Sequence, residues 1–323
     1  MPETLGNPLA TDVDSSRGGE RNGGLMARAR NIILHYHIFK NAGSTFSMAL
    51  ERNFGQSFGQ LHAPHHDERI SADALLDFVQ VRPDIVAISS HHLSPPAPAT
   101  DSVQFHEVLL LRDPLDRIRS MYDFYRRAAI TDDPLTLEAK CVALPEFLEY
   151  LIETRQNLVS NAQTNVVANA GAKIPENCDL NRALAILRAT AVVGVVENFD
   201  FCVLQAEHSL RPLFPELDLS YVRENVTPFR AKELQSRLDR FRQACGEKLY
   251  TKLVELNRFD MELVAAAGAE SLRRWRDISR QPMRLRNFRR RVHQRTIIRS
   301  VTDQFRRLQR VGKRAAGLLS HQD

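Results

Sequence analysis

The sequence predicts an α/β protein: a P-loop-like, three-layer α/β/α domain with a mainly parallel sheet and a helical C-terminal part. Four short runs are almost continuously apolar, which is typical of strands buried on both faces of a parallel sheet. Helical patterns lie between these runs, and this alternation predicts crossover connections between parallel strands. After about Ala231 the pattern is helical only, through Leu263.

The first expected strand is short and rich in β-branched and aromatic residues, and the other three are short apolar runs. The four runs are residues 31–38, 84–89, 107–111 and 191–196. The first leads through a turn into a helical pattern that extends to about Arg52. Asp113-Pro114 starts another helix, because Asp is a common N-cap and proline suits the first helical position. Leu144-Pro145 starts a further helix, and Asp179 is expected to cap one more.

The chain has 323 residues, of which 43% are hydrophobic and 26% charged, enough for one large core or two smaller ones. We divide it into a disordered leader (1–27), an α/β domain (28–268) and a basic, largely helical tail (269–323). The leader lacks a signal-peptide core, and no run reaches the roughly 20 apolar residues of a membrane span. These features predict a soluble, cytoplasmic protein. The cysteines are expected to be buried free thiols, with a disulfide as the alternative: Cys141, Cys178, Cys202 and Cys245.

The net charge of +5 is unevenly distributed. Residues 271–323 contain 16 Arg or Lys and 3 Asp or Glu, whereas the remainder contains 28 basic and 36 acidic residues. Residues 301–319 also have apolar positions near helical spacing, which suits an interfacial amphipathic helix. The tail is therefore a candidate for binding an anionic membrane surface or a polyanion, or it is a solvated extension. Its few aromatic residues disfavour nucleic acid as the partner, and nothing indicates the oligomeric state.

The turn after the first expected strand has the features of an anion-binding loop. A strand that enters a helix through a glycine-containing turn leaves backbone N–H groups exposed at the helix N-terminus. Lys40 adds a mobile positive charge, and Ser44 and Thr45 add hydroxyl donors. The loop is not a Walker A motif, because Lys40 precedes the only glycine, Gly43, by three residues. Alone, the segment is equally compatible with an ordinary strand–turn–helix.

A second polar segment follows the third expected strand. Arg112 ends that strand, and Ser120 lies two turns into the next helix. An arginine and a serine so placed can converge on one phosphate, through a charge-assisted pair and a hydroxyl hydrogen bond. Ligands of open α/β sheets bind beyond the carboxyl ends of the strands, so both segments belong to the same rim. The alternative is a capped helix whose arginines pair with nearby aspartates: Asp113, Asp116 and Asp123.

Taken together, the two segments resemble a known family. Residues 40–45 (KNAGST) resemble the 5′-phosphosulfate loop of sulfotransferases that use 3′-phosphoadenosine-5′-phosphosulfate (PAPS), particularly the carbohydrate branch that includes the heparan sulfate uronyl sulfotransferases. Residues 112–122 (RDPLDRIRSMY) resemble the 3′-phosphate motif of the same enzymes. The resemblance extends more weakly through residues 193–201, 225–228 and 256–263, and so covers roughly residues 31–264.

The resemblance implies a role for each matching residue. Lys40 would contact the 5′-phosphosulfate and stabilise charge on the departing phosphate oxygen, while Arg112 and Ser120 would bind the 3′-phosphate. The loop that holds the 5′-phosphate would consist of Asn41, Ala42, Gly43, Ser44 and Thr45. A loop closing over the nucleotide would include Asn225 and Thr227, with Arg230 as a further member. Phe39 stands where the family commonly has proline, which should alter loop stiffness more than chemistry.

Transfer of a sulfuryl group to a hydroxyl needs a base, and a histidine suits that role near neutral pH. His91 and His92 follow the second expected strand, on the rim where the resembled enzymes have a histidine base. Successive strand residues face opposite sides, so we expect one of them, His92 before His91, to face the acceptor. A nearby cluster could suggest a metal, but no metal is predicted, because none of its ligands has helical i, i+4 spacing and the resembled family needs none: His62, His65, His66, Asp67 and Glu68.

The sequence therefore predicts a PAPS-dependent sulfotransferase whose acceptor is a carbohydrate or a glycolipid. One alternative is a P-loop-like small-molecule kinase, which would need a magnesium ligand at the end of an apolar strand. Another is a nucleic-acid or membrane-surface binding protein that uses the basic tail. The identity of the acceptor and the position sulfated do not follow from the residues.

Overall fold

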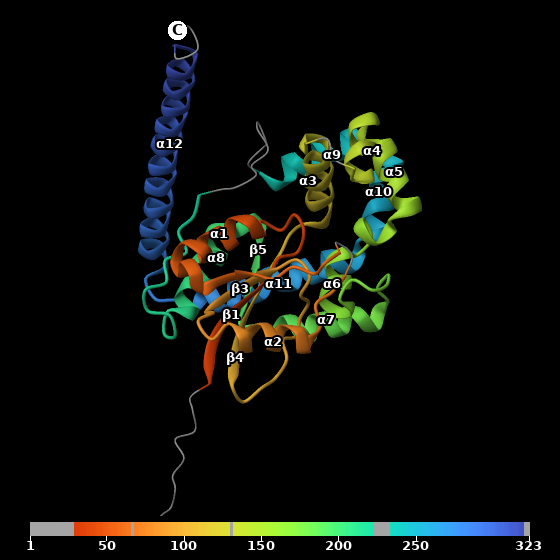
Figure 1. Cartoon of the computed structure of the whole chain (residues 1–323). Helices are drawn as coiled ribbons and strands as arrows, with labels where there is room; N and C mark the ends of the chain where they lie inside the picture. Colours follow the sequence, from red (N-terminus) through yellow and green to blue (C-terminus); the bar gives the residue numbers. More distant parts are fainter. Residues whose placement is uncertain (1–28, 66–67, 130–131, 223–232, 320–323) are drawn as a thin grey trace, which may run out of the picture.

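The computed structural model describes residues 29–65, 68–129, 132–222 and 233–319, with the backbone alone at residue 303 and from residue 305 onward. It contains five parallel strands in the order β2-β3-β1-β4-β5, with helices on both sides of the sheet (Figure 1). The predicted three-layer α/β/α class is confirmed. The leader expected at residues 1–27 lies outside the described residues.

The central strand is β1 (Arg30–Tyr36), which pairs with β3 (Ala87–Ser90) on one side and with β4 (Val103–Leu111) on the other. β5 (Val192–Val195) extends the sheet beyond β4, and β2 (Phe58–Gln60) extends it beyond β3. Each of the four predicted runs overlaps a strand, although β4 begins four residues before the predicted run. β2 was not predicted, because it has only three residues and a glycine in its centre.

Alternate residues of β1 enter different cores, as the pleat of a strand requires. Ile32 and Leu34 join a core formed with α2 (Ala72–Val81), α6 (Ala162–Asn169) and α7 (Asn177–Ala189). Ile33 joins the core on the other face, with α1 (Gly43–Phe54) and α8 (Phe199–Leu210). The sheet is thus buried on both faces, which explains the continuous apolar runs.

A third hydrophobic core lies among helices away from the sheet (Figure 1). It is formed by α3 (Pro114–Arg127), α4 (Pro134–Cys141), α5 (Leu144–Thr154), α9 (Leu234–Cys245) and α10 (Glu247–Leu256). As predicted, Asp113 caps α3, where its side chain accepts hydrogen bonds from the N–H groups of Leu115 and Asp116. Pro114 occupies the first helical position.

Two smaller predictions need correction. Asp179 is not an N-cap: it is the third residue of α7 and forms a capping box with Glu176, which precedes the helix. The four cysteines are free thiols in this structure, but only Cys202 and Cys245 are buried, while Cys141 and Cys178 are exposed. Exposure follows from their places, since Cys141 ends α4 and Cys178 is in the first turn of α7.

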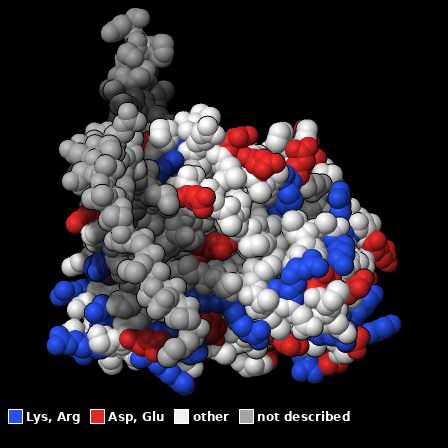
Figure 2. Space-filling view, turned by 90° about the horizontal axis from the view of Figure 1, so that it is seen from below, with Lys and Arg blue, Asp and Glu red and all other residues white. Residues whose placement is uncertain are grey.

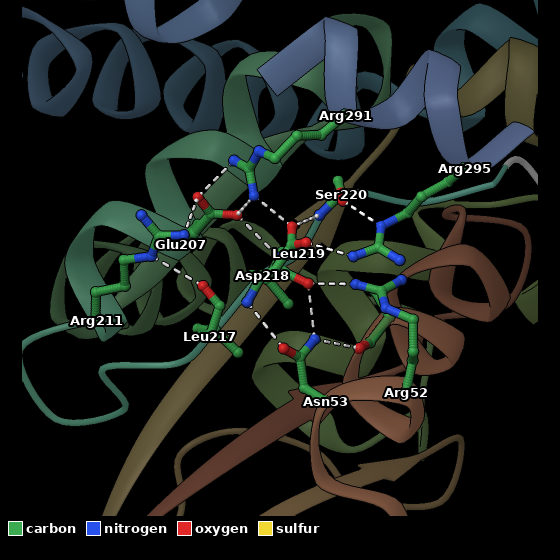
Figure 3. Close-up of polar contacts among 11 residues, drawn as sticks. Arg52, Asn53, Glu207, Arg211, Leu217, Asp218, Leu219, Ser220, Arg291 and Arg295 are labelled. Carbon is green, nitrogen blue, oxygen red and sulfur yellow. Dashed lines mark hydrogen bonds and ion pairs between the residues drawn. The ribbon is translucent and has the colours of Figure 1, made fainter. Parts of the chain in front are cut away.

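The C-terminal region comprises α11 (Arg258–Arg276) and the long α12 (Gln281–Leu319). Position 268 falls within α11, which packs on β5, and Trp275 and Phe288 are buried in the core beside α8. Basic side chains of α12 also bind acidic groups of the domain (Figure 3). On the face shown in Figure 2, basic and acidic side chains are interspersed. None of the described helices combines the length and apolarity of a bilayer span.

Candidate functional site

The loop between β1 and α1 has an unusual backbone. Lys40 has a φ of 67° and Ala42 a φ of 59°, and they are two of the five residues other than glycine with positive φ in the described part of the chain. A left-handed conformation costs such residues roughly 1–2 kcal/mol each. Ala42 precedes α1 and makes no side-chain cap, and the uncapped N-terminus of a helix is a place where anions can bind. Strain concentrated in this way is typical of functional loops.

Gly43 is required by the packing of His37. A Cβ atom on Gly43 would lie 1.8 Å from the Cδ2 atom of the His37 ring, far inside contact distance. The imidazole of His37 therefore lies directly against the start of α1. The only glycine of the predicted loop thus makes room for a neighbouring side chain, a role that the loop sequence alone does not reveal.

Three imidazoles follow one another from the sheet to the rim. The rings of His35 and His37, on one side of β1, lie 5.5 Å apart, and the ring of His37 stacks on that of His91 at 3.7 Å. Burial, followed by the nearby His91, lowers the pKa of His35 to about 3. Burial, followed by the nearby His35, His91, Lys40 and His62, lowers the pKa of His37 to about 2. Both inner rings are therefore neutral at physiological pH.

His35 continues this arrangement into the interior. Its Nδ1 lies 2.9 Å from the hydroxyl of Ser89, which is 2.7 Å from the hydroxyl of Ser47. Its buried Nε2 has no hydrogen-bond partner among the described residues. The sequence analysis missed His35 and His37, although their alternation on a strand that ends at the predicted loop was a usable signal.

His92 takes a different direction from His91. Its Nδ1 lies 2.9 Å from the carbonyl oxygen of Glu68, and because a carbonyl only accepts, the neutral ring carries its proton on Nδ1. Its ring also contacts that of His62, with the centroids 6.1 Å apart. His92 is half-buried, whereas His91 is exposed. The structure thus brings both candidate bases to the rim, His91 beside the Lys40 loop and His92 beside Glu68 and Ile70.

Arg112 lies at the carboxyl end of β4, directly beside the loop. Its guanidinium donates 2.7 Å to the carbonyl oxygen of Lys40, and it is only 4% exposed. Its Nε and Nη2 also donate to Asp116, at 3.0 and 2.9 Å. Asp116 is shared with Arg237 of α9, so two arginines surround one carboxylate. The alternative pairing of Arg112 with Asp116 is therefore present in this structure.

The remaining phosphate-motif residue, Ser120, is buried on α3, one turn beyond Asp116. The two hydroxyl residues of the loop differ in burial, because Thr45 is buried and Ser44 is half-buried. Asn225, Thr227 and Arg230 lie outside the described residues.

Lys40 is held by aromatic rings. Its Nζ lies 4.4 Å from the ring centroid of Phe124 in α3 and 5.6 Å from that of Phe39. The two phenylalanine rings pack edge to face, with centroids 5.4 Å apart. A cation over an aromatic face gains roughly 0.5–2 kcal/mol. Phe39, which departs from the family pattern, therefore helps to position the charge of the loop.

Glu197 is a further rim residue, from the turn after β5. Its carboxylate accepts a hydrogen bond from the N–H of Asp113, at 3.0 Å, and so supports the turn that carries Arg112. Burial raises the pKa of both Glu197 and Asp113. The magnesium ligand that the kinase alternative requires would have to be a rim carboxylate such as Asp113 or Glu197.

A cavity of about 340 Å³ adjoins the loop. It extends along α1 from Thr45 to Arg52, and α12 forms its other side. Arginines from both helices line it together with apolar side chains: Met48, Ala49, Arg52, Tyr221, Val222, Arg295, Ile298 and Arg299. The cavity is suited to an organic anion with an apolar part.

Among the described residues, no three His, Cys, Asp or Glu side chains are grouped as a metal site. Of the expected histidine-rich cluster, His65 and Glu68 are exposed and lie 3.9 Å apart, while residues 66 and 67 are outside the described part.

No protein-family model matches the chain. The chain is similar to an uncharacterized protein of Archaeoglobus fulgidus, with 29% identity over 243 residues, which cover 72% of this chain and 94% of the archaeal protein. The similarity spans most of the archaeal chain, but its description assigns no function. What the fold and the rim define is therefore an α/β/α protein with a strained loop, a basic group and an imidazole cluster at the carboxyl ends of β1, β3 and β4.

We expect Gly43→Ala to lower the free energy of unfolding by about 2 kcal/mol, because the added methyl group overlaps the His37 ring. Removing that ring with His37→Ala should restore part of the loss, and urea unfolding of both single variants and the double variant measures the coupling. Gly268→Ala is the control, since nothing lies near a Cβ there. If Gly43→Ala destabilises the His37→Ala variant as much as it destabilises the unmodified chain, glycine is required at position 43 by the backbone and not by the His37 ring.

We also expect stability to fall in mild acid. In the unfolded chain His35 binds a proton near its ordinary pKa of 6.5, whereas in the folded protein it does so only near pH 3, so stability is lost as the pH drops below about 6.5. Between pH 7 and about pH 5, His35 alone should cost roughly 2 kcal/mol. Denaturant unfolding at both pH values tests this, and His35→Gln should flatten the dependence. An unchanged slope in that variant contradicts the assignment.

Proposed function

We propose that the protein is a sulfotransferase that transfers a sulfuryl group from PAPS to a hydroxyl of a carbohydrate or glycolipid acceptor. The observation that carries the proposal is the junction of the two phosphate segments. The guanidinium of Arg112 bonds to the carbonyl oxygen of Lys40, so the segments that resemble the 5′-phosphosulfate and 3′-phosphate motifs form one continuous rim. The proposal is further supported by the parallel sheet, whose ligands bind at this edge.

Each part of this rim suits a step of sulfuryl transfer. The first N–H groups of α1 and the ammonium of Lys40 can stabilise negative charge on a 5′-phosphate as it becomes the leaving group. The aromatic support of Lys40 by Phe124 limits how far that charge moves. Arg112 follows β4 and Ser120 lies on α3, and a guanidinium and a hydroxyl so placed can bind a 3′-phosphate through a charge-assisted pair and a hydrogen bond.

A histidine is suited to take the proton of the acceptor hydroxyl as that oxygen attacks sulfur in line with the leaving group. The geometry supports His91 more than His92, because the His91 ring reaches the loop through its stacking on His37. His37 itself is a poor base, since burial holds its pKa at about 2. The role of His37 is to position the neighbouring ring.

We expect 3′,5′-ADP to bind much more tightly than 5′-ADP or ATP with Mg²⁺ in calorimetric titrations of the full chain, because only it carries the 3′-phosphate. No acceptor is needed for this measurement. Ser120→Ala should weaken binding of 3′,5′-ADP by roughly 10- to 100-fold, since a hydrogen bond to a charged group contributes roughly 1.5–3 kcal/mol. Binding of 5′-ADP by the same variant is the matched control and should not change.

Ser120 is preferred to Arg112 for this test, because Arg112→Ala leaves the buried Asp116 short of a partner and endangers folding. Tighter binding of ATP with Mg²⁺ than of 3′,5′-ADP would favour a kinase. Equal effects of Ser120→Ala on both diphosphates would remove Ser120 from the 3′-phosphate site.

The choice of base is tested by release of 3′,5′-ADP from PAPS over a panel of carbohydrate acceptors. We expect His91→Ala to lower kcat by about 10²-fold or more and to leave the affinity for 3′,5′-ADP unchanged, because a base acts in the transition state. His92→Ala is the matched control on the adjacent residue. Loss of turnover in His92→Ala alone would make His92 the base, and full turnover in both variants would exclude a base from this pair.

A further inference from the structure

The apolar stripe of α12 changes sides part of the way along the helix. Phe288 is fully buried against the domain, and Val292 packs against the same core. Ile297 and Val301 lie nine residues further on, and nine residues of α-helix are two and a half turns. They therefore lie on the opposite side of α12, where they are 50% and 51% exposed. The domain leaves this second stripe uncovered at its described residues.

Contacts of α12 with the domain concentrate in its first four turns. Arg289 pairs with Asp200, Arg291 with Glu207, and Arg295 with Asp218, as Figure 3 shows for the last two. Beyond these pairs the helix continues to Leu319 and projects from the body of the protein (Figure 1). In the sequence, the spacing of Ile298 and Val301 is continued by later apolar positions: Phe305, Leu308, Ala315 and Leu319.

The projecting part of α12 is strongly basic. Residues 296–319 contain six Arg or Lys and a single acidic residue, Asp303. By the helical repeat, the basic positions fall on the side opposite the second apolar stripe: Arg299, Arg306, Arg307, Arg310, Lys313 and Arg314. A helix with an apolar face and an arginine-rich polar face, but little overall hydrophobicity, is the form that lies in the interface of a lipid bilayer.

We propose that residues 296–319 of α12 dock the protein on an anionic lipid bilayer. The apolar stripe enters the boundary between headgroups and acyl chains, and the arginines bind anionic headgroups. A second copy of the helix is a poorer occupant of the stripe. Two copies would bring twelve basic side chains together, and Gly312 and Ala315 in the stripe offer little apolar surface for pairing.

Docking in this way places the candidate site at the membrane surface. Ile298 and Arg299, at the start of the docking segment, line the same cavity as Thr45 of the loop. An acceptor that is anchored in the bilayer would then reach the rim without leaving the membrane. The docking itself depends only on α12 and does not require the proposed sulfotransferase function.

The test is flotation of the full chain with vesicles of phosphatidylcholine, with and without phosphatidylglycerol. We expect binding to the anionic vesicles, little binding to phosphatidylcholine alone, and release by high salt. Val301→Asp should reduce binding to anionic vesicles by about tenfold or more, because it places a carboxylate in the apolar stripe. Arg306→Glu combined with Arg310→Glu should reduce it to a similar extent.

The matched control is Val81→Asp, at an exposed valine that ends α2, 77% exposed and outside α12. It should bind as the unmodified chain does. Circular dichroism checks that each variant is folded. Equal binding to both vesicle types, or anionic binding that survives Val301→Asp, would overturn the proposal. A dimer in light scattering that Val301→Asp dissociates, with no vesicle binding, would assign the stripe to a second copy instead.

Discussion

The candidate site depends on one buried amide, that of Gln163 in the first turn of α6. Its oxygen accepts from the N–H of Arg112 at 2.9 Å and from the side chain of Asn41 at 2.8 Å. Its nitrogen donates to the carbonyl oxygen of Arg112 and to Asp260. The amide is wholly buried, and these four bonds satisfy it completely. It joins the strained loop to the end of β4, so Lys40 and Arg112 are held in one relative position.

This junction continues into the C-terminal helices. Asp260 of α11 accepts from the N–H groups of Gln163 and Thr164, and so caps the start of α6. In the opposite direction, the side-chain oxygen of Asn161 accepts hydrogen bonds from the N–H groups of Phe259 and Asp260. Each of these bonds holds the junction in place, because a buried polar group that loses its partner costs roughly 1–3 kcal/mol. The left-handed conformations at Lys40 and Ala42 are thus offset by bonds made far from the loop.

The elements that the sequence predicted well are those whose cause is local. Continuous apolar runs mark β1, β3, β4 and β5, and Asp113-Pro114 carries its own cap. Features with distant causes were not predictable. Gln163 lies 122 residues from Asn41 and has no local pattern, and β2 forms only because β3 lies beside it. The positions of Lys40 and Arg112 on one rim followed from topology, but the shared Asp116 and the ring of His37 against Gly43 required coordinates.

The basic residues of α12 fall into two groups, those that pair with the domain and those beyond it, and the composition alone does not distinguish them. Arg289, Arg291 and Arg295 pair with acidic groups of the domain. Glu207 illustrates why such pairs are needed, because it is 2% exposed and pairs with both Arg211 and Arg291. A buried carboxylate is tolerated only when it is paired in this way. Part of the acidic excess of residues 1–270 is therefore paired in the folded protein with part of the basic excess of the tail. The basic residues that follow Arg299 lie on a segment that projects from the domain, and an external anionic surface is the partner that their number and spacing favour.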